Sequence, residues 1–505
     1  MSGRLAQLMS DTFFYAAGLV LRRGLSLLTL PVFTRYLNPH QFGVLAIVHT
    51  VGQLLTVAFE AGVPNATTRF YYDERTDADR RRLLTTLFVL VMGIAIAGAL
   101  VALWLGPLVW PSIAPDVPFH PYVSLTIVGL VCSVVAVVPR QLFRVTSRVR
   151  LFSALSLAQG VFTAGVSIAL LTVGDLGVMA SILGGLIASA VFGVVFLAYL
   201  LPYLTWGFSL RRARSALAFG LPDIPVQVGG WALKVADRLI LQAYVPLAAV
   251  GLYSLGYTLG GTPIGLIAAA VNAGIMPFFY RMASEESPRE CGRIFSGIAA
   301  YNAALFAFLA LGTMLFAREV ILVFATPEYL PAEAVVPLIA WGAVFRGLEN
   351  VPVRSIYVAK KTLYLPAVFV VPAALNVALN FVLIPRWGIA GAAWATLLSY
   401  PALVGLTLLA AQRLYYIPYD YVRIAKPLVI ALLLSWARGL VPAEPLLHAI
   451  AWKTLLLAAF PVALVLTGFV TPDERRELGR LLRRAIRERA RPRVRTAVPA
   501  VVEDR

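Results

Sequence analysis

Apolar residues fill most of the chain in long runs, which short charged or Pro/Gly-rich breaks separate. A helix needs about 20 residues to cross the hydrocarbon core of a membrane, and most runs reach this length. Cutting the chain at the breaks predicts spans near residues 12–34, 44–66, 84–106, 120–143, 152–173, 178–200, 217–244, 249–276, 295–317, 334–357, 363–384, 389–411, 426–441 and 447–470. The pattern therefore predicts an all-α integral membrane protein of about fourteen transmembrane helices.

Composition excludes a soluble protein. Of the 505 residues, 60% are hydrophobic and only 13% are charged, whereas soluble domains carry about 25% charged residues. So few charges can neither solvate the surface of a globular domain of this size nor keep the chain disordered. The connections between the predicted spans are also too short to hold a large soluble domain.

The basic residues indicate how the chain is oriented in the membrane. The formal net charge is +18. Basic side chains cluster in every second connection, near residues 69–82, 144–150, 211–214, 281–293, 360–361 and 413–426. Lys and Arg are enriched in the short cytoplasmic loops of multispanning proteins. We therefore predict an N-in and C-in topology, and we interpret the basic surplus as an orientation signal rather than as a nucleic-acid site.

Two parts of the chain resemble each other. Gly177 and Gly388 each follow a tight connection and open a helix of small residues, and residues 38–43 resemble residues 246–251. We predict two six-helix lobes related by an internal repeat, plus two extra C-terminal helices; the alternative is that small-residue helices share only composition. The predicted domains are an N-terminal lobe at 1–210, a C-terminal lobe at 211–412, two extra transmembrane helices at 413–470 and a tail at 471–505.

The tail has the signature of an amphipathic helix. Thr471 can cap a helix whose first turn holds Pro472, and Glu474 completes a capping box. An apolar stripe opposite the arginines follows, formed by Leu478, Leu481, Leu482 and Ile486. We predict a basic cytoplasmic amphipathic tail that binds anionic membrane lipids; a helix surrounded by solvent is the alternative.

Charged residues inside the predicted spans indicate a polar interior, because a charge costs about 2.5–3.5 kcal/mol or more at the centre of a bilayer. Arg22 and Arg23 lie near the midplane of the first span. The seventh span carries Lys234, Asp237 and Arg238, whose spacing puts them on one helical face.

Three further charges complete this set: Glu60 in the second span, and Arg346 and Glu349 in the tenth. Bases outnumber acids, so we predict a central cavity that prefers an anion and uses arginine for paired hydrogen bonds to phosphate. The predicted substrate-binding residues are Arg22, Arg23, Lys234, Arg238 and Arg346. The predicted ion-coupling or charge-pairing residues are Glu60, Asp237 and Glu349. An internal ion-pair cluster that only fixes helix packing is the alternative for the seventh span.

Motifs for chemistry are absent from the sequence. It contains no phosphate-binding loop, no dinucleotide-binding glycine motif and no His-Glu-x-x-His zinc motif, and its four histidines are scattered. We therefore predict a membrane transporter without catalytic residues, metal or cofactor.

Four stretches of the sequence carry a family likeness, namely residues 31–43, Asp237-Arg238 followed by 250–257, Asn376 to Asn380, and 384–393. With these motifs the chain resembles the polysaccharide-biosynthesis flippases (Wzx-type translocases) of the MOP exporter superfamily. The resemblance implies alternating access between two lobes, through which an undecaprenyl-pyrophosphate-linked oligosaccharide moves from the inner to the outer leaflet of a bacterial cytoplasmic (inner) membrane. It also implies that a glycan polymerase and glycosyltransferases of the same pathway are partners.

The resemblance extends to the related lipid II flippases. Those proteins carry arginines on their first helix, and this chain has Arg22 and Arg23 there. Those proteins also use arginine on helices 2 and 8, where this chain offers Glu60 and Asn272. This departure favours a lipid-linked glycan other than lipid II. The alternatives are a cation-coupled multidrug antiporter of the same superfamily, which the basic interior disfavours, and a membrane glycan polymerase or ligase, which the short outer loops disfavour.

The topology is testable with single cysteines in a chain whose Cys132 and Cys291 are replaced by serine. A membrane-impermeant maleimide should label the outer positions in intact cells, namely Asp116, Asp175 and Glu444. It should label the inner positions only after permeabilisation, namely Asp77, Lys361 and Arg480. The reason is the alternation of basic connections, and labelling of position 480 from outside would contradict the even number of spans.

Overall fold

The computed structural model describes residues 24–471 apart from 26, 286 and 438–445, together with 474 and 476. Every regular element in that part of the chain is helical. Residues 27–36 are helical and lead into α2. The α-helices are α2 (Pro39–Glu60), α3 (Val63–Tyr71), α4 (Asp77–Ile113), α5 (Ser124–Val134), α6 (Val137–Val145), α7 (Val149–Thr172), α8 (Val178–Leu200), α9 (Leu210–Gly220), α10 (Ile224–Trp231), α11 (Asp237–Leu241), α12 (Leu247–Glu285), α13 (Pro288–Leu315), α14 (Ala317–Phe324), α15 (Val336–Leu348), α16 (Pro352–Val358), α17 (Leu365–Leu414), α18 (Tyr421–Trp436) and α19 (Leu446–Leu466).

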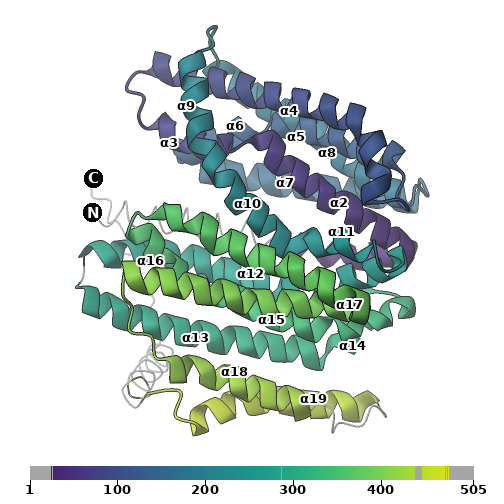
Figure 1. Ribbon diagram of the computed structural model, residues 1–505, viewed down its shortest axis with the longest axis vertical. Coiled ribbons are helices and arrows are strands. Elements are labelled where there is room, and N and C mark those ends of the chain that lie inside the picture. The colour runs from purple at the N-terminus through teal and green to yellow at the C-terminus, as the bar shows by residue number, and fades with distance from the viewer. Residues whose placement is uncertain are drawn as a thin grey trace, which may run out of the picture.

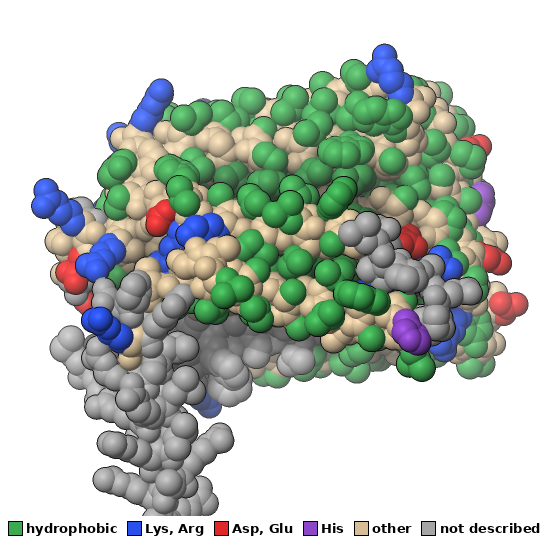
Figure 2. Space-filling view, turned by 90° about the horizontal axis from the view of Figure 1, so that it is seen from below, with side chains coloured by type: hydrophobic (Ala, Val, Ile, Leu, Met, Phe, Trp, Pro, Cys, Tyr) green, Lys and Arg blue, Asp and Glu red, His purple; other side chains and the backbone are tan. Residues whose placement is uncertain are grey.

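Nine helices in the described residues are long and apolar enough to cross a membrane, and a tenth is added if a pair bent at residue 335 counts as one span. Apolar side chains cover the middle of the face shown in Figure 2, and charged side chains gather toward its two ends. This surface has the pattern of an apolar belt between two polar rims, as a bilayer requires. The finding confirms the predicted all-α membrane class.

Local sequence decides where the helices begin and break. The Asn38 side chain accepts a hydrogen bond from Gln41 N while the Gln41 side chain accepts one from Asn38 N, so this capping box starts α2. The predicted span 217–244 is not one regular helix. It is broken into α9, α10 and α11 by a 3₁₀ turn at Leu221–Asp223 and a π-helical turn at Ala232–Ala236, and prolines at the first break explain the interruption there.

One predicted break lies inside a single long element of the structure. The spans expected at 363–384 and 389–411 both belong to α17, but the backbone between them is kinked and not helical at Gly388, where φ is 54° and ψ is −130°. Gly177 stands at the matching place before α8 and has φ of 51° and ψ of −128°. Because positive φ favours glycine, both helices start from the same unusual backbone conformation. This agreement supports the internal repeat, whereas the proposed domain limits stay a prediction.

The helices form two groups (Figure 1). The first contains α2 to α8, the second contains α12 to α17, and α18 and α19 lie beside α13 on the far side of the second group. The broken helix α9–α11 connects the groups, because α9 packs on α3 and α4 whereas α10 packs on α17.

An ion-pair network anchors the start of this connecting helix. Arg212 of α9 lies 2.8 Å from Glu74 and 2.8 Å from Asp79. The hydrogen bond to Glu74 raises the pKa of the Arg212 guanidinium, so the anchor stays charged.

The two groups meet backbone to backbone where α2 crosses α12. A Cβ atom built on Gly43 would lie 2.0 Å from Leu247 O, and one built on Gly251 would lie 1.9 Å from Pro39 O. Each glycine therefore faces the first turn of the opposite helix, and the contact is nearly symmetrical. Helix pairs in membranes approach this closely only through small residues.

The crossing predicts a specific cost for one methyl group. Gly251→Ala should lower the thermal unfolding midpoint of the purified protein, since overpacking at a close contact costs about 1–3 kcal/mol. Gly265→Ala is the matched control in the same helix, because a Cβ atom there meets nothing within 4 Å. Equal midpoints for the two variants would contradict a close crossing.

Candidate functional site

A buried ion pair lies where the π-helical turn of the connecting helix meets α11. Asp237 Oδ1 accepts a hydrogen bond from Arg238 Nη1 at 2.9 Å, and the side chains are 1% and 8% exposed. Tyr253 of α12 donates to Asp237 Oδ2, and the Thr396 hydroxyl of α17 donates to the same oxygen at 3.4 Å. Two neighbouring helices therefore help to hold this carboxylate.

Aromatic side chains surround the cation of this pair. The guanidinium carbon of Arg238 lies 4.4 Å from the centre of the Tyr257 ring, close enough for a cation–π interaction. The hydroxyls of Tyr257 and Tyr400 lie 3.5 Å apart, and Tyr400 donates to Leu233 O at 3.2 Å. These contacts join α12 and α17 to the connecting helix.

A second ion pair lies at the break between α15 and α16. Arg346 Nη1 is 2.5 Å from Glu349 Oε2; the Arg346 side chain is 44% exposed, whereas that of Glu349 is 2% exposed. The charge of Arg346 also acts on Tyr257 and Tyr400, which line the first pair. The structure thus brings Asp237, Arg238, Arg346 and Glu349 into one region of the second helix group, which we call the C-lobe charge cluster. Lys234 is exposed and belongs to the same turn of the connecting helix.

The other predicted residues lie elsewhere. Glu60 ends α2 in the first helix group, where the charge of Arg140 on α6 acts on its carboxylate. Arg22 and Arg23 lie outside the described residues, as does the predicted tail stripe at 478–486. Within the part of the chain that the structure describes, no three His, Cys, Asp or Glu side chains converge as metal ligands.

Two arginines that the sequence analysis passed over lie near positions that it did single out. The charge of Arg140 acts on the Glu60 carboxylate, and Arg354 of α16 donates to Asn272 of α12 at 2.6 Å. A neighbouring helix therefore brings an arginine close to each of these two positions. Both arginines closely follow a proline, in the fourth and tenth predicted spans, which the predicted repeat would make equivalent.

The comparison with protein families rests on residues 8–283, which match the model of a family described as polysaccharide biosynthesis protein. The chain belongs to this family. The match covers more than half of the 505 residues and confirms the resemblance seen in the sequence motifs.

One curated relative is a probable low-salt glycan biosynthesis flippase, Agl15 of Haloferax volcanii. It is 23% identical over 192 residues, which cover 38% of this chain and 40% of that protein. The present chain therefore aligns with less than half of that relative's length.

Solved structures share the fold. The lipid II flippase MurJ in an inward closed conformation superimposes with a TM-score of 0.74 at 13% identity, over 88% of this chain and 97% of that one. An inward-facing multidrug resistance MATE family transporter of the MOP superfamily gives 0.61 at 15% identity, over 77% and 94% of the two chains. The MATE transporter VcmN of Vibrio cholerae superimposes with a TM-score of 0.54 at 13% identity, over 82% of this chain and 97% of that one. At such identities the likeness shows the fold alone, which is the MurJ and MATE fold.

The buried pair makes a prediction about stability. Asp237→Ala should sharply reduce membrane abundance, because removing one partner leaves Arg238 buried and uncompensated at a cost of about 3–5 kcal/mol. The double variant Asp237→Ala/Arg238→Ala should recover part of that loss, since no lone charge remains. Abundance and thermal unfolding of both variants check this, with Asp116→Ala in an exposed connection as the control. If the stability lost by the double variant equals the sum of the losses of the two single variants, the ion pair does not exist in the membrane.

Proposed function

We propose that this protein is a flippase that moves an undecaprenyl-pyrophosphate-linked oligosaccharide, such as a repeat unit of O-antigen, capsule or exopolysaccharide, from the inner to the outer leaflet. The observation that carries the proposal is the family match over residues 8–283. The MurJ-like fold and the curated flippase relative support it. The same comparisons support the transporter role.

The substrate's pyrophosphate binds the cationic residues of the interior. In the C-lobe charge cluster, Arg346 is half exposed, so its guanidinium can meet a ligand while its partner Glu349 stays buried. Arg238 is enclosed by its own carboxylate and by tyrosines, and it acts chiefly by holding the connecting helix in place. Lys234, Arg22 and Arg23 supply further positive charge along the substrate's path.

The carboxylates Glu60, Asp237 and Glu349 pair with these cations, which removes part of the cost of placing charge inside a membrane. Protonation or ion binding at one of them, with Asp237 in the most enclosed position, couples substrate movement to an ion gradient. The two lobes alternate about the α2–α12 crossing, which joins their backbones at one end.

The proposed setting is a bacterial cytoplasmic membrane, crossed by about fourteen spans with both termini inside. The basic tail at 471–505 binds anionic lipids, and glycosyltransferases and a glycan polymerase act before and after the flipping step.

A multidrug antiporter is the second candidate, because MATE transporters share the fold. Such a protein moves organic cations, which the net basic set of interior residues disfavours. Export of a cationic dye from cells that express the protein, without any effect on glycan export, would favour this candidate.

The function is tested by three variants measured in the same cells. Arg22→Ala, Arg23→Ala and Arg346→Ala should each lower glycan export at least several-fold at normal membrane abundance, because each removes a cation that binds the pyrophosphate. Lysine at these positions should restore export only in part, since it lacks the paired donors of arginine. Arg386→Ala is the control, because this arginine of α17 is exposed and donates to the backbone carbonyl of Val382 in its own helix. If membrane abundance falls in parallel with glycan export, these residues are structural and the ligand-binding assignment is wrong. Normal export by the double Arg22/Arg23 variant would contradict the cationic mechanism.

A further inference from the structure

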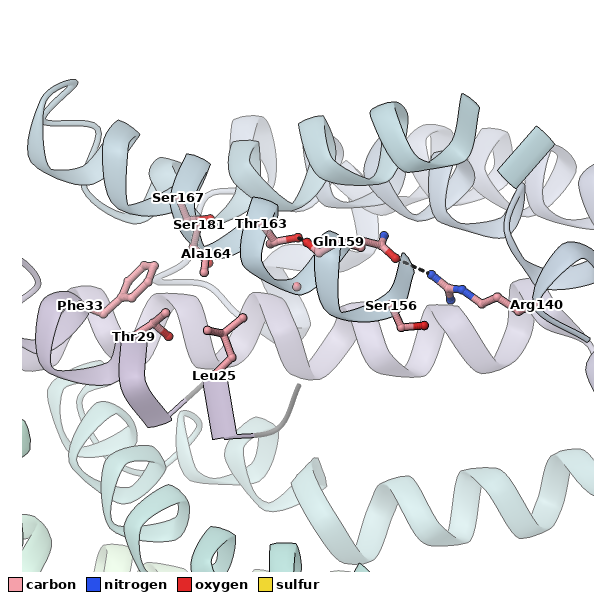
Figure 3. Close-up of a pocket in the computed structure, with 11 residues that line it drawn as sticks. Leu25, Thr29, Phe33, Arg140, Ser156, Gln159, Thr163, Ala164, Ser167 and Ser181 are labelled. Carbon is pink, nitrogen blue, oxygen red and sulfur yellow. Dashed lines mark hydrogen bonds between the residues drawn. The ribbon is translucent and has the colours of Figure 1, made fainter. Parts of the chain in front are cut away.

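A polar pocket of about 330 Å³ lies inside the first helix group, away from the C-lobe charge cluster. Figure 3 shows its side chains converging from the helical segment before α2, from α6, from α7 and from α8. Its lining comprises Leu25, Thr29, Phe33, Arg140, Ser156, Gln159, Gly160, Thr163, Ala164, Ser167 and Ser181. The volume falls near the lower end of the roughly 300–1,000 Å³ typical of small-ligand pockets.

The polar residues of α7 are placed with helical regularity. Ser156, Gln159, Thr163 and Ser167 are three or four positions apart and all line the pocket. The opposite face carries exposed apolar side chains, including Leu151 and Val161. In a membrane helix this means that α7 turns an apolar face outward and a polar face toward the pocket.

Several of these groups have unused hydrogen-bonding capacity. Serine and threonine in this protein usually donate to the carbonyl three or four residues back, as Thr163 does to Gln159 O at 2.7 Å. Among the described residues, the hydroxyls of Ser156, Ser167 and Ser181 have no such partner. The Gln159 carbonyl accepts from Arg140 at 3.0 Å, which leaves its NH₂ group available. Polar groups inside a membrane protein are costly unless something bonds to them.

The charge of the pocket narrows the ligand class. No carboxylate belongs to its lining, so it does not suit a metal ion or an organic cation. Its one cation, Arg140, is already bonded to Gln159, stacked 5.3 Å from the centre of the Phe196 ring and influenced by Glu60. The other polar groups of the lining are uncharged hydroxyls and one amide. Hydroxyl and amide groups that both donate and accept fit a neutral ligand rich in hydroxyls.

We infer that this pocket binds a sugar residue of the transported glycan. The inference rests on the proposed function and deepens it, because it gives the sugar half of the substrate a site of its own, separate from the C-lobe charge cluster. The pyrophosphate is held by the cations of the interior, and a neutral sugar ring is held by Ser156, Gln159, Ser167 and Ser181 of the first helix group. The Phe33 ring offers an apolar surface for the C–H face of that sugar.

The test compares two probes on purified full-length protein. One is the lipid-linked glycan extracted from membranes of the source cells, and the other is undecaprenyl pyrophosphate, which carries no sugar. The triple variant Ser156→Ala/Ser167→Ala/Ser181→Ala should bind the glycan-bearing probe about tenfold more weakly, equivalent to about 1.4 kcal/mol, and should bind undecaprenyl pyrophosphate as the wild type does. Gln159→Leu should show the same selective loss.

The matched control is Ser124→Ala/Ser133→Ala/Ser435→Ala, whose hydroxyls donate to carbonyls of the local backbone at 3.1, 2.7 and 2.7 Å. It should leave both affinities unchanged, and equal thermal unfolding midpoints show that each variant is folded. If the wild type prefers the glycan-bearing probe but the triple variant and Gln159→Leu keep that preference, the inference is wrong while the proposed function stands. Binding of neither probe by the wild type would overturn the proposed function itself.

Discussion

A charge inside a membrane must be compensated, and this requirement organises the interior of the protein. In the C-lobe charge cluster each charged residue is paired with a residue of opposite charge. Asp237 and Arg238 lie 2.9 Å apart, and Arg346 and Glu349 lie 2.5 Å apart. Because each pair joins residues close in sequence, the neighbouring helices contribute hydroxyls and aromatic rings rather than countercharges. Neither of these two pairs links one lobe to the other; ion pairs do so at the start of the connecting helix, where Arg212 meets Glu74 and Asp79.

The close contact between α2 and α12, which joins the lobes, depends on backbone packing and not on charge. Gly43 and Gly251 let the backbones of α2 and α12 approach closely, with no charge and little side-chain volume at the crossing. Such a contact gains its stability from close packing, which is lost steeply on separation. A joint of this type suits a protein whose two halves exchange a closed and an open arrangement, because opening it leaves no unpaired charge behind.

Much of the fold could be predicted from the sequence, because the signal was strong and local. Long apolar runs fixed the class, and the paired glycines Gly177 and Gly388 indicated a repeat whose backbone angles agree. Interruptions inside spans were harder, since the π-helical turn at Ala232–Ala236 depends on tertiary packing. The partners of Glu60 and Asn272 could not be found by reading one helix, because Arg140 and Arg354 reach them from other helices. The serine-lined pocket escaped notice because hydroxyls on membrane helices are common, and only the structure shows which ones lack a partner.

The central claim is that the protein moves a lipid-linked glycan between leaflets. It is tested most directly in vesicles that contain the purified protein and sugar-labelled lipid-linked glycan from the source cells, with a membrane-impermeant glycosidase or quencher reporting the outer leaflet. The account predicts that the protected pool becomes accessible within minutes when the wild-type protein is present, and only slowly with Arg346→Ala or in protein-free vesicles. Equal rates in vesicles with and without the wild-type protein, under an imposed ion gradient of either sign, would contradict it.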